Sequence, residues 1–379
     1  MLPDITIRII RMTFSVLLLT SSLFLYATTS NVYHPTLETN RTLMTEADSS
    51  SNNQLSLLFV GDLMQHQAQI EAAHRPNGSY NYTHCFSLVK EDIRDADLAI
   101  GNLETTLGGE PYRGYPQFCA PDEYLHALKD TGFDILATAN NHSLDRRRHG
   151  LERTLNLTDS IGILTVGTYR NSEDRQKRYP LIVEKNGIRI ALLCATYGTN
   201  GIANTPPNIV NSLNRNELIE DIRQARTLKS DVIIAIMHWG NEYQRLPNSE
   251  QQSLARWLIE QGVDHVIGSH PHVVQPIELI PAIEHPTHHA VVYSLGNYVS
   301  NMSIAHGDVG LTVKLTLEKI GTKTRLKDIS HGLVWTERAS ISQHGDFRII
   351  PSDTIPTDLT PEGRQRMSRA IAAEEGHIW

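Results

Sequence analysis

Cysteine is scarce in this chain of 379 residues, which contains only Cys85, Cys119 and Cys194. No two of them have the CxxC spacing that is typical of thiolate metal sites. In an exported protein Cys85 could pair with Cys119, but an odd count leaves one thiol over, and three buried thiols account for the sequence equally well. The cysteines therefore argue against a thiolate-bound metal and decide little else.

The chain also lacks a basic excess, since 34 Lys and Arg stand against 42 Asp and Glu, for a formal net charge of −8. This balance argues against an electrostatic nucleic-acid binder, so we expect no nucleic acid among its partners. Hydrophobic residues make up 40% of the chain, which suits one large core or two modest ones.

No apolar run reaches the roughly 20 residues that span a membrane comfortably. The nearest is 12–27, which follows Arg8 and Arg11 and precedes a polar stretch rich in Ser, Thr and Asn. This layout predicts an export signal, with cleavage slightly favoured over retention as an anchor. We expect residues 1–30 to be a signal peptide or N-terminal anchor, 31–53 a linker, and the protein to be exported to a periplasmic or other extracytoplasmic location.

From residue 54 onward, short apolar runs alternate with amphipathic segments, the pattern of an α/β domain. Asn186-Gly187 predicts a tight hairpin between 180–185 and 188–196, so the sheets are not purely parallel. The alternating segment 308–319 favours an edge strand. We expect one α/β domain over 54–345, with two packed sheets flanked by helices, and a C-terminal extension over 346–379.

Polar donors follow the apolar runs at their carboxyl ends, where ligands gather in parallel sheets. They are Asp62, Glu104, Asn141 with His142, His238, and His270 with His272. Taken singly, each has a plain structural explanation, such as a helix cap or a satisfied core histidine. Together they describe one polar site assembled from distant sequence, which we interpret as a metal centre.

Nitrogen and oxygen donors without thiolate suit Zn, Mn or Fe better than Ca or Mg. Six such donors are too many for one tetrahedral ion and indicate two divalent ions that share a carboxylate. Paired ions about 3.5–4 Å apart clamp the attacking and leaving oxygens in phosphoryl displacement.

Six motifs in order carry a family resemblance: GDLMQH, GNLE, ANNHSLD, HWGNEY, GSHPHVVQP and YSLGN. They resemble the CapA family of poly-γ-glutamate capsule-synthesis proteins, which are related to the calcineurin-like metallophosphoesterases. The resemblance covers about residues 55–300. It implies a metallophosphoesterase-like four-layer α/β/β/α sandwich with two mixed sheets.

The resemblance also implies roles for single residues. Glu104 would bridge two ions, one held by Asn141, His238 and His270 and the other by Asp62 and His272. His142 would donate a proton to the leaving oxygen. Asp145 could orient His142, although we expect it to cap the following helix.

Two positions depart from the metallophosphoesterase pattern. Met64 stands where those enzymes carry a histidine, and His66 either supplies the missing nitrogen or nothing does. Glu104 replaces the usual bridging Asp with a longer arm. A full pair of ions, a single ion and a catalytically weak pair therefore remain open.

Substrate contacts are expected from three residues around the site. Arg113, in the Gly/Pro/Tyr-rich loop 108–124, could grip a carboxylate or phosphate. His66 and Asn297 lie in the GDLMQH and YSLGN motifs, and hydrogen bonding within the site is the expected role of Asn297. The expected substrate is an anionic polymer or a phosphoester.

Three functions fit these features. The first is a metal-dependent hydrolase or transferase in capsule or poly-γ-glutamate biosynthesis, and the second is a phosphodiesterase on another substrate. The third is a non-catalytic, membrane-proximal scaffold that binds polymer or membrane-bound synthase subunits. Met64 favours the scaffold, whereas the other donors favour an enzyme, because a scaffold has no physical need for them.

Overall fold

The structure, a computed structural model, describes residues 43–44, 53–282 and 288–379. The predicted signal or anchor over 1–30 and most of the predicted linker over 31–53 lie outside the described residues. Within the described ranges, no helix has both the length and the apolar character that a membrane crossing requires.

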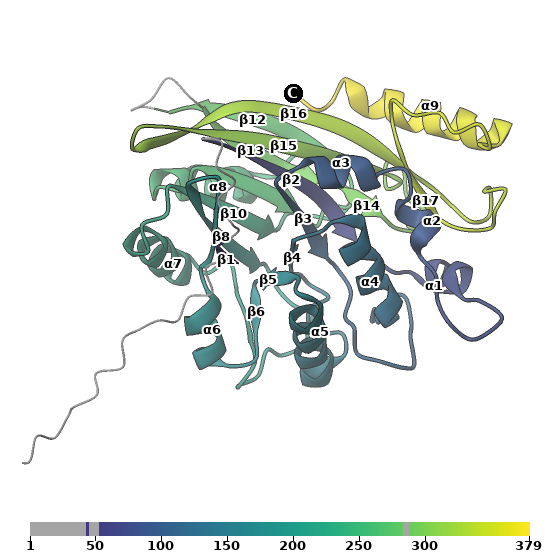
Figure 1. The fold of residues 1–379 in the computed structure, drawn as a ribbon, viewed down its shortest axis with the longest axis horizontal. Helices are drawn as coiled ribbons and strands as arrows, with labels where there is room; N and C mark the ends of the chain where they lie inside the picture. Colours follow the sequence, from purple (N-terminus) through teal and green to yellow (C-terminus); the bar gives the residue numbers. More distant parts are fainter. Residues whose placement is uncertain (1–42, 45–52, 283–287) are drawn as a thin grey trace, which may run out of the picture. The chain divides into compact units, whose positions relative to one another are not determined.

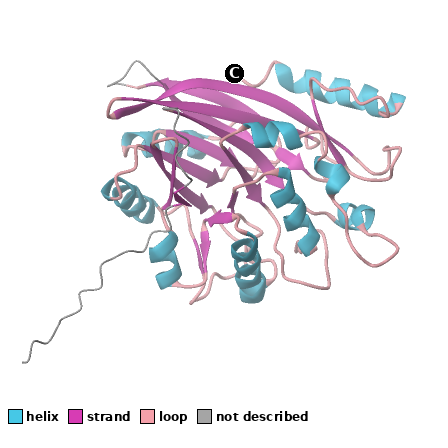
Figure 2. Ribbon diagram, viewed as in Figure 1, coloured by secondary structure: helices cyan, strands magenta, loops and turns pink. Residues whose placement is uncertain are grey.

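Two mixed β-sheets form the middle of the protein (Figures 1 and 2). The first has the strand order β1-β7-β8-β10-β11-β13-β12. Its strands are β1 (Leu43–Met44), β7 (Leu181–Lys185), β8 (Ile188–Thr196), β10 (Val232–His238), β11 (His265–Ser269), β13 (His288–Leu295) and β12 (Val274–Pro281).

The second sheet has the order β17-β16-β15-β2-β3-β4-β5, with β14 paired to β2. Its strands are β17 (Arg348–Pro351), β16 (Lys323–Glu337), β15 (Val309–Ile320), β2 (Gln54–Leu63), β3 (Leu98–Leu103), β4 (Ile135–Ala137), β5 (Leu164–Val166) and β14 (Asn297–Val299). A small separate sheet pairs β6 (Thr168–Tyr169) with β9 (Ile209–Val210).

Parallel strands carry the predicted donors in both sheets. In the first sheet β8, β10, β11 and β13 run parallel, while β7 and β12 are antiparallel to their neighbours. In the second, β2 to β5 run parallel and β15 to β17 antiparallel. Parallel strands covered on both faces are apolar throughout, which is why their sequences lack polar alternation.

Helices cover the outer faces of the two sheets. Those on the second sheet are α1 (Gln67–Ala73), α2 (Thr83–Phe86), α3 (Lys90–Asp95) and α4 (Asp122–Thr131), and those on the first are α7 (Arg215–Thr227) and α8 (Ser249–Glu260). The remaining helices are α5 (Arg147–Ile161), α6 (Ser172–Arg178) and α9 (Pro361–Glu375). The predicted four-layer α/β/β/α sandwich is confirmed.

Strand β2 separates two hydrophobic cores. Leu57 and Phe59 pack in the core shared with the first sheet, whereas Leu58 and Val60 pack beneath the helices. Successive side chains of a strand point to opposite faces, so both faces of β2 are buried. The end of this strand is therefore held in place from both sides.

A β-bulge at the end of β2 redirects Asp62. Val60 pairs with Gly101 and Asp62 pairs with Asn102, which leaves Gly61 as the extra residue. Without a bulge, Asp62 would share the helix-covered face with Val60; the extra residue turns it toward the first sheet. A Cβ on Gly61 would lie 2.0 Å from the carbonyl oxygen of Gly296, so only glycine fits here.

Several local predictions can be compared directly with the structure. Asn186 and Gly187 have φ values of 52° and 72° and close the β7–β8 hairpin, as predicted. The prediction of an edge strand over 308–319 is wrong, because β15 lies between β2 and β16. Its alternating pattern instead reflects one buried face and one partly exposed face. All three cysteines are buried and free, so Cys85 and Cys119 do not pair.

Residues 346–379 supply β17 to the edge of the second sheet and end in α9. This helix lies along β16, in yellow in Figure 1. Its side chains Met367 and Ile371 are buried in the core.

Candidate metal centre

The predicted donors meet where the two sheets present their carboxyl ends. The second sheet contributes Asp62 from β2, Glu104 directly after β3 and Asn141 from the loop after β4. The first sheet contributes His238, the last residue of β10, and His270 and His272, which follow β11. All six side chains are buried.

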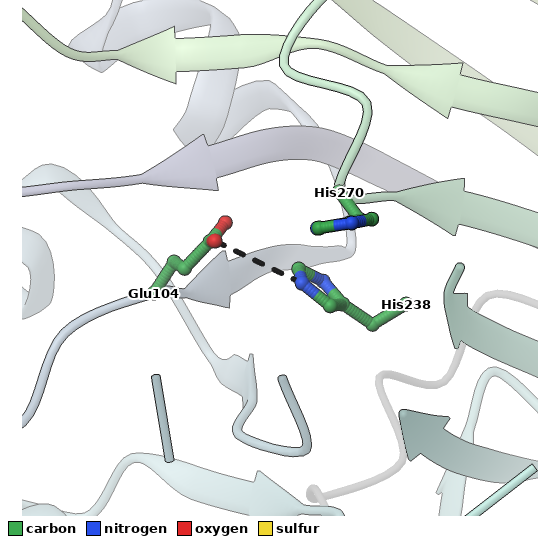
Figure 3. Close-up of side chains that lie close together, drawn as sticks. All are labelled: Glu104, His238 and His270. Atoms are coloured by element: carbon green, nitrogen blue, oxygen red, sulfur yellow. Dashed lines mark ion pairs between the residues drawn. The ribbon is translucent and has the colours of Figure 1, made fainter. Parts of the chain in front are cut away.

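Three overlapping groups, formed by five of these side chains and Glu242, offer ligand atoms within 4.8 Å of one another. One contains Glu104, His238 and His270, which Figure 3 shows with the two rings facing the carboxylate. Another contains Asp62, Glu104 and His272, and the last contains Glu242, His270 and His272. Glu104 is thus the carboxylate that the first two groups share.

Three atoms in the centre are buried and have no hydrogen-bond partner among the described residues: Asp62 Oδ2, Glu104 Oε1 and His270 Nδ1. Of these, Asp62 Oδ2 lies 3.2 Å from His272 Nδ1, which is hydrogen bonded to Asn297 instead. A buried polar atom without a partner costs about 1–3 kcal/mol, and more when it is charged. Glu104 Oε1 lies 3.7 Å from His238 Nε2 and 3.8 Å from His272 Nε2, too far for hydrogen bonds. Divalent cations would satisfy these oxygen and nitrogen atoms, so the residues fit the metal ions that the family resemblance implies.

Burial shapes the electrostatics of the centre. It raises the pKa of Glu104 well above its usual value, and the nearby Asp62 carboxylate raises it further. Burial also lowers the pKa of His238, and it lowers the pKa of His270 to about 4. Both rings are therefore neutral near pH 7, which is the form that binds metal ions.

Hydrogen bonds to Nδ1 fix the orientation of two of the rings. His238 Nδ1 lies 2.9 Å from Ser269 Oγ, and His272 Nδ1 lies 3.0 Å from Asn297 Oδ1. Each ring then turns Nε2 toward Glu104. Metal-binding histidines are commonly held in this way. Asn297 is fully buried behind His272, where it hydrogen bonds within the site.

Two asparagines that the sequence reasoning missed hold the carboxylates. Asn102 Nδ2 donates to Asp62 Oδ1 at 2.8 Å and lies 3.3 Å from Glu104 Oε2. Asn140 Nδ2 in turn donates to Asn102 Oδ1 at 3.1 Å. The alternation of side chains along a strand could have indicated Asn102, because residues two apart, such as Asn102 and Glu104, share one face.

His142 lies beside the centre with a partner of its own. Its Nδ1 is 2.6 Å from Asp145 Oδ2, and its ring packs edge-on against Phe118. The backbone N–H of Phe118 donates to the same carboxylate oxygen at 2.6 Å. Helix α5 has Arg146 at its N-cap without a side-chain cap. The expectation that Asp145 caps this helix is wrong, because its carboxylate is engaged by His142 and Phe118.

The remaining predicted residues lie at the margin of the centre. Among the described residues, His66 belongs to none of the three ligand groups, and its Nδ1 lies 3.2 Å from Gln69 Oε1 and 3.3 Å from the N–H of Asn301. Met64 is fully buried. Arg113 is exposed, and its backbone pairs with Cys119.

Glu242, in the HWGNEY motif, is a further candidate ligand. It is exposed and shares a ligand group with His270 and His272. Two tyrosines also border the centre. The ring of Tyr197 lies 4.5 Å from the ring of His270, and the ring of Tyr243 lies 6.3 Å from the ring of His272. Burial raises the pKa of Tyr197 to about 12, so its hydroxyl is neutral near pH 7.

Fold and site together define a four-layer α/β/β/α protein with a candidate two-metal centre. The family model of the bacterial capsule synthesis protein PGA_cap matches residues 56–302, and the chain belongs to this family. The predicted family assignment is confirmed.

Two relatives have names that state a role. The capsule biosynthesis protein CapA of Bacillus anthracis is 27% identical over 283 residues, which is 72% of this chain and 66% of that protein. The PGA biosynthesis protein CapA of Bacillus subtilis (strain 168) is 29% identical over 291 residues, which is 72% of this chain and 70% of that protein. About a third of each relative thus lies outside the match.

Two solved structures align with the chain at low identity. The NAD nucleotidase of Haemophilus influenzae gives a TM-score of 0.47 at 13% identity and covers 86% of this chain and 63% of that one. The calcineurin-like phosphoesterase YfkN of Bacillus subtilis gives 0.42 at 14% identity, covering 84% and 98%.

Proposed function

We propose that this protein is an exported, metal-dependent hydrolase or transferase that acts on a phosphoester or an anionic polymer during synthesis of a capsule or poly-γ-glutamate. One observation carries this proposal. Candidate metal ligands from both sheets lie together, several of their buried atoms have no hydrogen-bond partner among the described residues, and the His142–Asp145 pair lies beside them. The role in surface-polymer synthesis is supported by the names of the two relatives, and export by the predicted N-terminal signal.

Two divalent cations, of Mn, Zn or Fe, would bind at the centre. Glu104, His238 and His270, with Asn141 Oδ1 2.9 Å from His238 Nε2, would hold one ion. Asp62, Glu104 and His272 would hold the other, and Glu242 is within reach of the two neighbouring histidines. Bound there, the cations would stabilise negative charge that develops on the transferring group.

The chain itself would supply the proton. Asp145 accepts a hydrogen bond from His142 Nδ1 at 2.6 Å and so fixes the orientation of the ring. The other ring nitrogen is then able to protonate a leaving oxygen, a step that typically contributes 10²–10⁴-fold to rate. Phe118 packs against the ring and helps to keep it in this orientation.

Metal content and turnover of the purified protein test this proposal together. After loading with Mn²⁺, the protein is assayed on a chromogenic phosphodiester, a phosphomonoester and a γ-glutamyl peptide. We expect about two ions per chain and turnover on at least one substrate. His142→Ala should retain the ions and lose at least 100-fold in rate.

The matched control is His149→Ala, because His149 is exposed on α5 and its ring contacts the carbonyl oxygen of Gly108 outside the centre. This variant should keep wild-type turnover. Equal rates for His142→Ala and the wild type would rule out the assigned role of His142.

Met64 supports a second candidate, the non-catalytic scaffold for polymer or membrane-bound synthase subunits. Its buried thioether stands where the metallophosphoesterase pattern has a histidine ligand, and His66 is engaged elsewhere. Bound metal without turnover on any of the three substrates would favour the scaffold over the enzyme.

A further inference from the structure

The C-terminal helix α9 carries a fully buried carboxylate, that of Glu374. One of its oxygens lies 3.0 Å from Arg245 Nη2, and the other lies 2.5 Å from His306 Nδ1. Both partners belong to loops next to the metal centre, whereas α9 lies outside the matched segment 56–302. A buried charge is retained only when it is well paired, and these two contacts pair it.

The His306 contact leads by hydrogen bonds to a candidate ligand. The next residue, Gly307, accepts a hydrogen bond from Asn297 Nδ2 through its carbonyl oxygen at 2.9 Å. The other side-chain atom of Asn297, Oδ1, is 3.0 Å from His272 Nδ1. His306 has a φ of 67°, an unfavourable value for histidine that the bond to Glu374 helps to maintain.

The Arg245 contact leads to His272 by a second route, through the loop after β10. Arg245 follows Glu242 and Tyr243 in the loop after β10, and the N–H of Tyr243 donates to the carbonyl oxygen of Pro271 at 2.8 Å. The Tyr243 ring packs near the His272 ring. His377, just beyond α9, contacts the carbonyl oxygen of Arg245 at 2.6 Å. Both loops that flank His272 are thus fastened to α9.

We propose that Glu374 is a positioning residue for the ion site formed by Asp62, Glu104 and His272, so that the C-terminal helix is a functional part of the metal centre. It acts through His306 and Arg245 and touches neither ion nor substrate. This inference rests on the proposed metal centre but does not depend on turnover. Among the described residues, Asn297 makes no hydrogen bond to His238 or His270, so we expect the other ion site to keep its affinity.

The test is a Mn²⁺ titration of the full chain by calorimetry, comparing the wild type with Glu374→Gln. Residues that orient metal ligands typically change affinity 10–100-fold when altered. Because Glu374 acts through one further residue, we expect one of the two binding steps to lose about tenfold in affinity and the other to stay unchanged. Electron paramagnetic resonance should show the signal of coupled Mn²⁺ ions giving way to that of a single ion.

Asp221→Asn is the matched control. Asp221 lies on α7, away from the centre, and its buried carboxylate pairs with Arg175 of α6 at 2.7 Å. It should lower thermal stability and leave both Mn²⁺ affinities as in the wild type. His306→Phe removes only the contact between Glu374 and His306, and it replaces Glu374→Gln in the test if that variant fails to fold. It should also weaken only one step.

Two unchanged Mn²⁺ affinities in Glu374→Gln and His306→Phe would overturn the inference and leave the proposed function standing. A tenfold loss in a protein without turnover on any substrate would support the inference while the proposed catalysis fails. A wild type that binds no second Mn²⁺ would overturn the inference together with the two-ion centre.

Discussion

Burial keeps several histidines of this protein in the neutral form near pH 7. Burial lowers the pKa of His66 and His270 to about 4, and that of His265 to about 3. His265 lies at the start of β11 and accepts a hydrogen bond from the N–H of Ala290 through Nδ1 at 3.1 Å. It must remain neutral to do so, and it stands five positions before the nearest candidate ligand.

His265 should make the fold sensitive to acid. Its folded pKa of about 3 lies below the unfolded value of 6.5, so between these values only the unfolded chain takes up the proton. Stability therefore falls as the pH falls from 6.5 toward 3, by about 3 kcal/mol at pH 4. Urea denaturation at pH 7, 6, 5 and 4 measures this loss.

His265→Asn supplies the comparison, because asparagine can accept the same hydrogen bond and does not titrate. The difference in unfolding free energy between wild type and variant should shift by about 1.4 kcal/mol per pH unit below 6.5. Parallel pH profiles for the two proteins would exclude this role of His265.

At the scale of elements, the ends of strands and the loops after them make the site. The bulge in β2 redirects Asp62, the end of β3 presents Glu104, and the loop after β11 turns His270 and His272 with φ values of 100° and 59°. Left-handed conformations cost of order 1–3 kcal/mol each for residues other than glycine. The fold holds both residues in this conformation, and their rings face the same centre.

Gly61→Ala should damage both the sheet and the centre. The added Cβ would meet the carbonyl oxygen of Gly296 at 2.0 Å, and a backbone atom cannot move aside cheaply. We expect a loss of about 3 kcal/mol in stability and weaker Mn²⁺ binding, because Asp62 is displaced. Gly198→Ala is the control, since nothing lies within 4 Å of its Cβ. Similar melting temperatures for the two variants would contradict the assigned role of the bulge.

At the scale of the whole molecule, the candidate ligands join the two sheets. Asp62 and Glu104 come from the second sheet and His238, His270 and His272 from the first, so cations bound between them would cross-link two layers of the sandwich. Ligands that bind only the folded state stabilise it by mass action.

Mn²⁺ should therefore raise the free energy of unfolding, by about 2.7 kcal/mol at a free concentration 100 times Kd. Glu104→Gln should abolish most of this gain, because it removes the carboxylate common to two ligand groups. Urea denaturation with Mn²⁺ and with a chelator measures the gain. The Glu71→Gln variant should retain it in full, because Glu71 is exposed, accepts a hydrogen bond from Gln67 at 3.0 Å and belongs to none of the ligand groups. An equal gain in Glu104→Gln would exclude Glu104 as a ligand.

The sequence by itself determined the features that are written locally along the chain. Apolar runs set the strands, Asn186-Gly187 set a hairpin, and the polar residue after each run marked the donors. Residue type also restricted the metal chemistry, because nitrogen and oxygen donors are present and paired thiolates are not. The strands and the hairpin are confirmed because strand periodicity and turn conformation depend on a few neighbouring residues.

The tertiary structure alone decided which donors meet and what supports them. Asn102 and Asn140 look like ordinary strand and turn residues until they are seen to hold the carboxylates. Asp145 has the sequence position of a helix cap, yet its partners are His142 and Phe118. Glu374 joins residues 68 and 129 positions away. Such contacts follow from packing between distant segments, which no local pattern specifies.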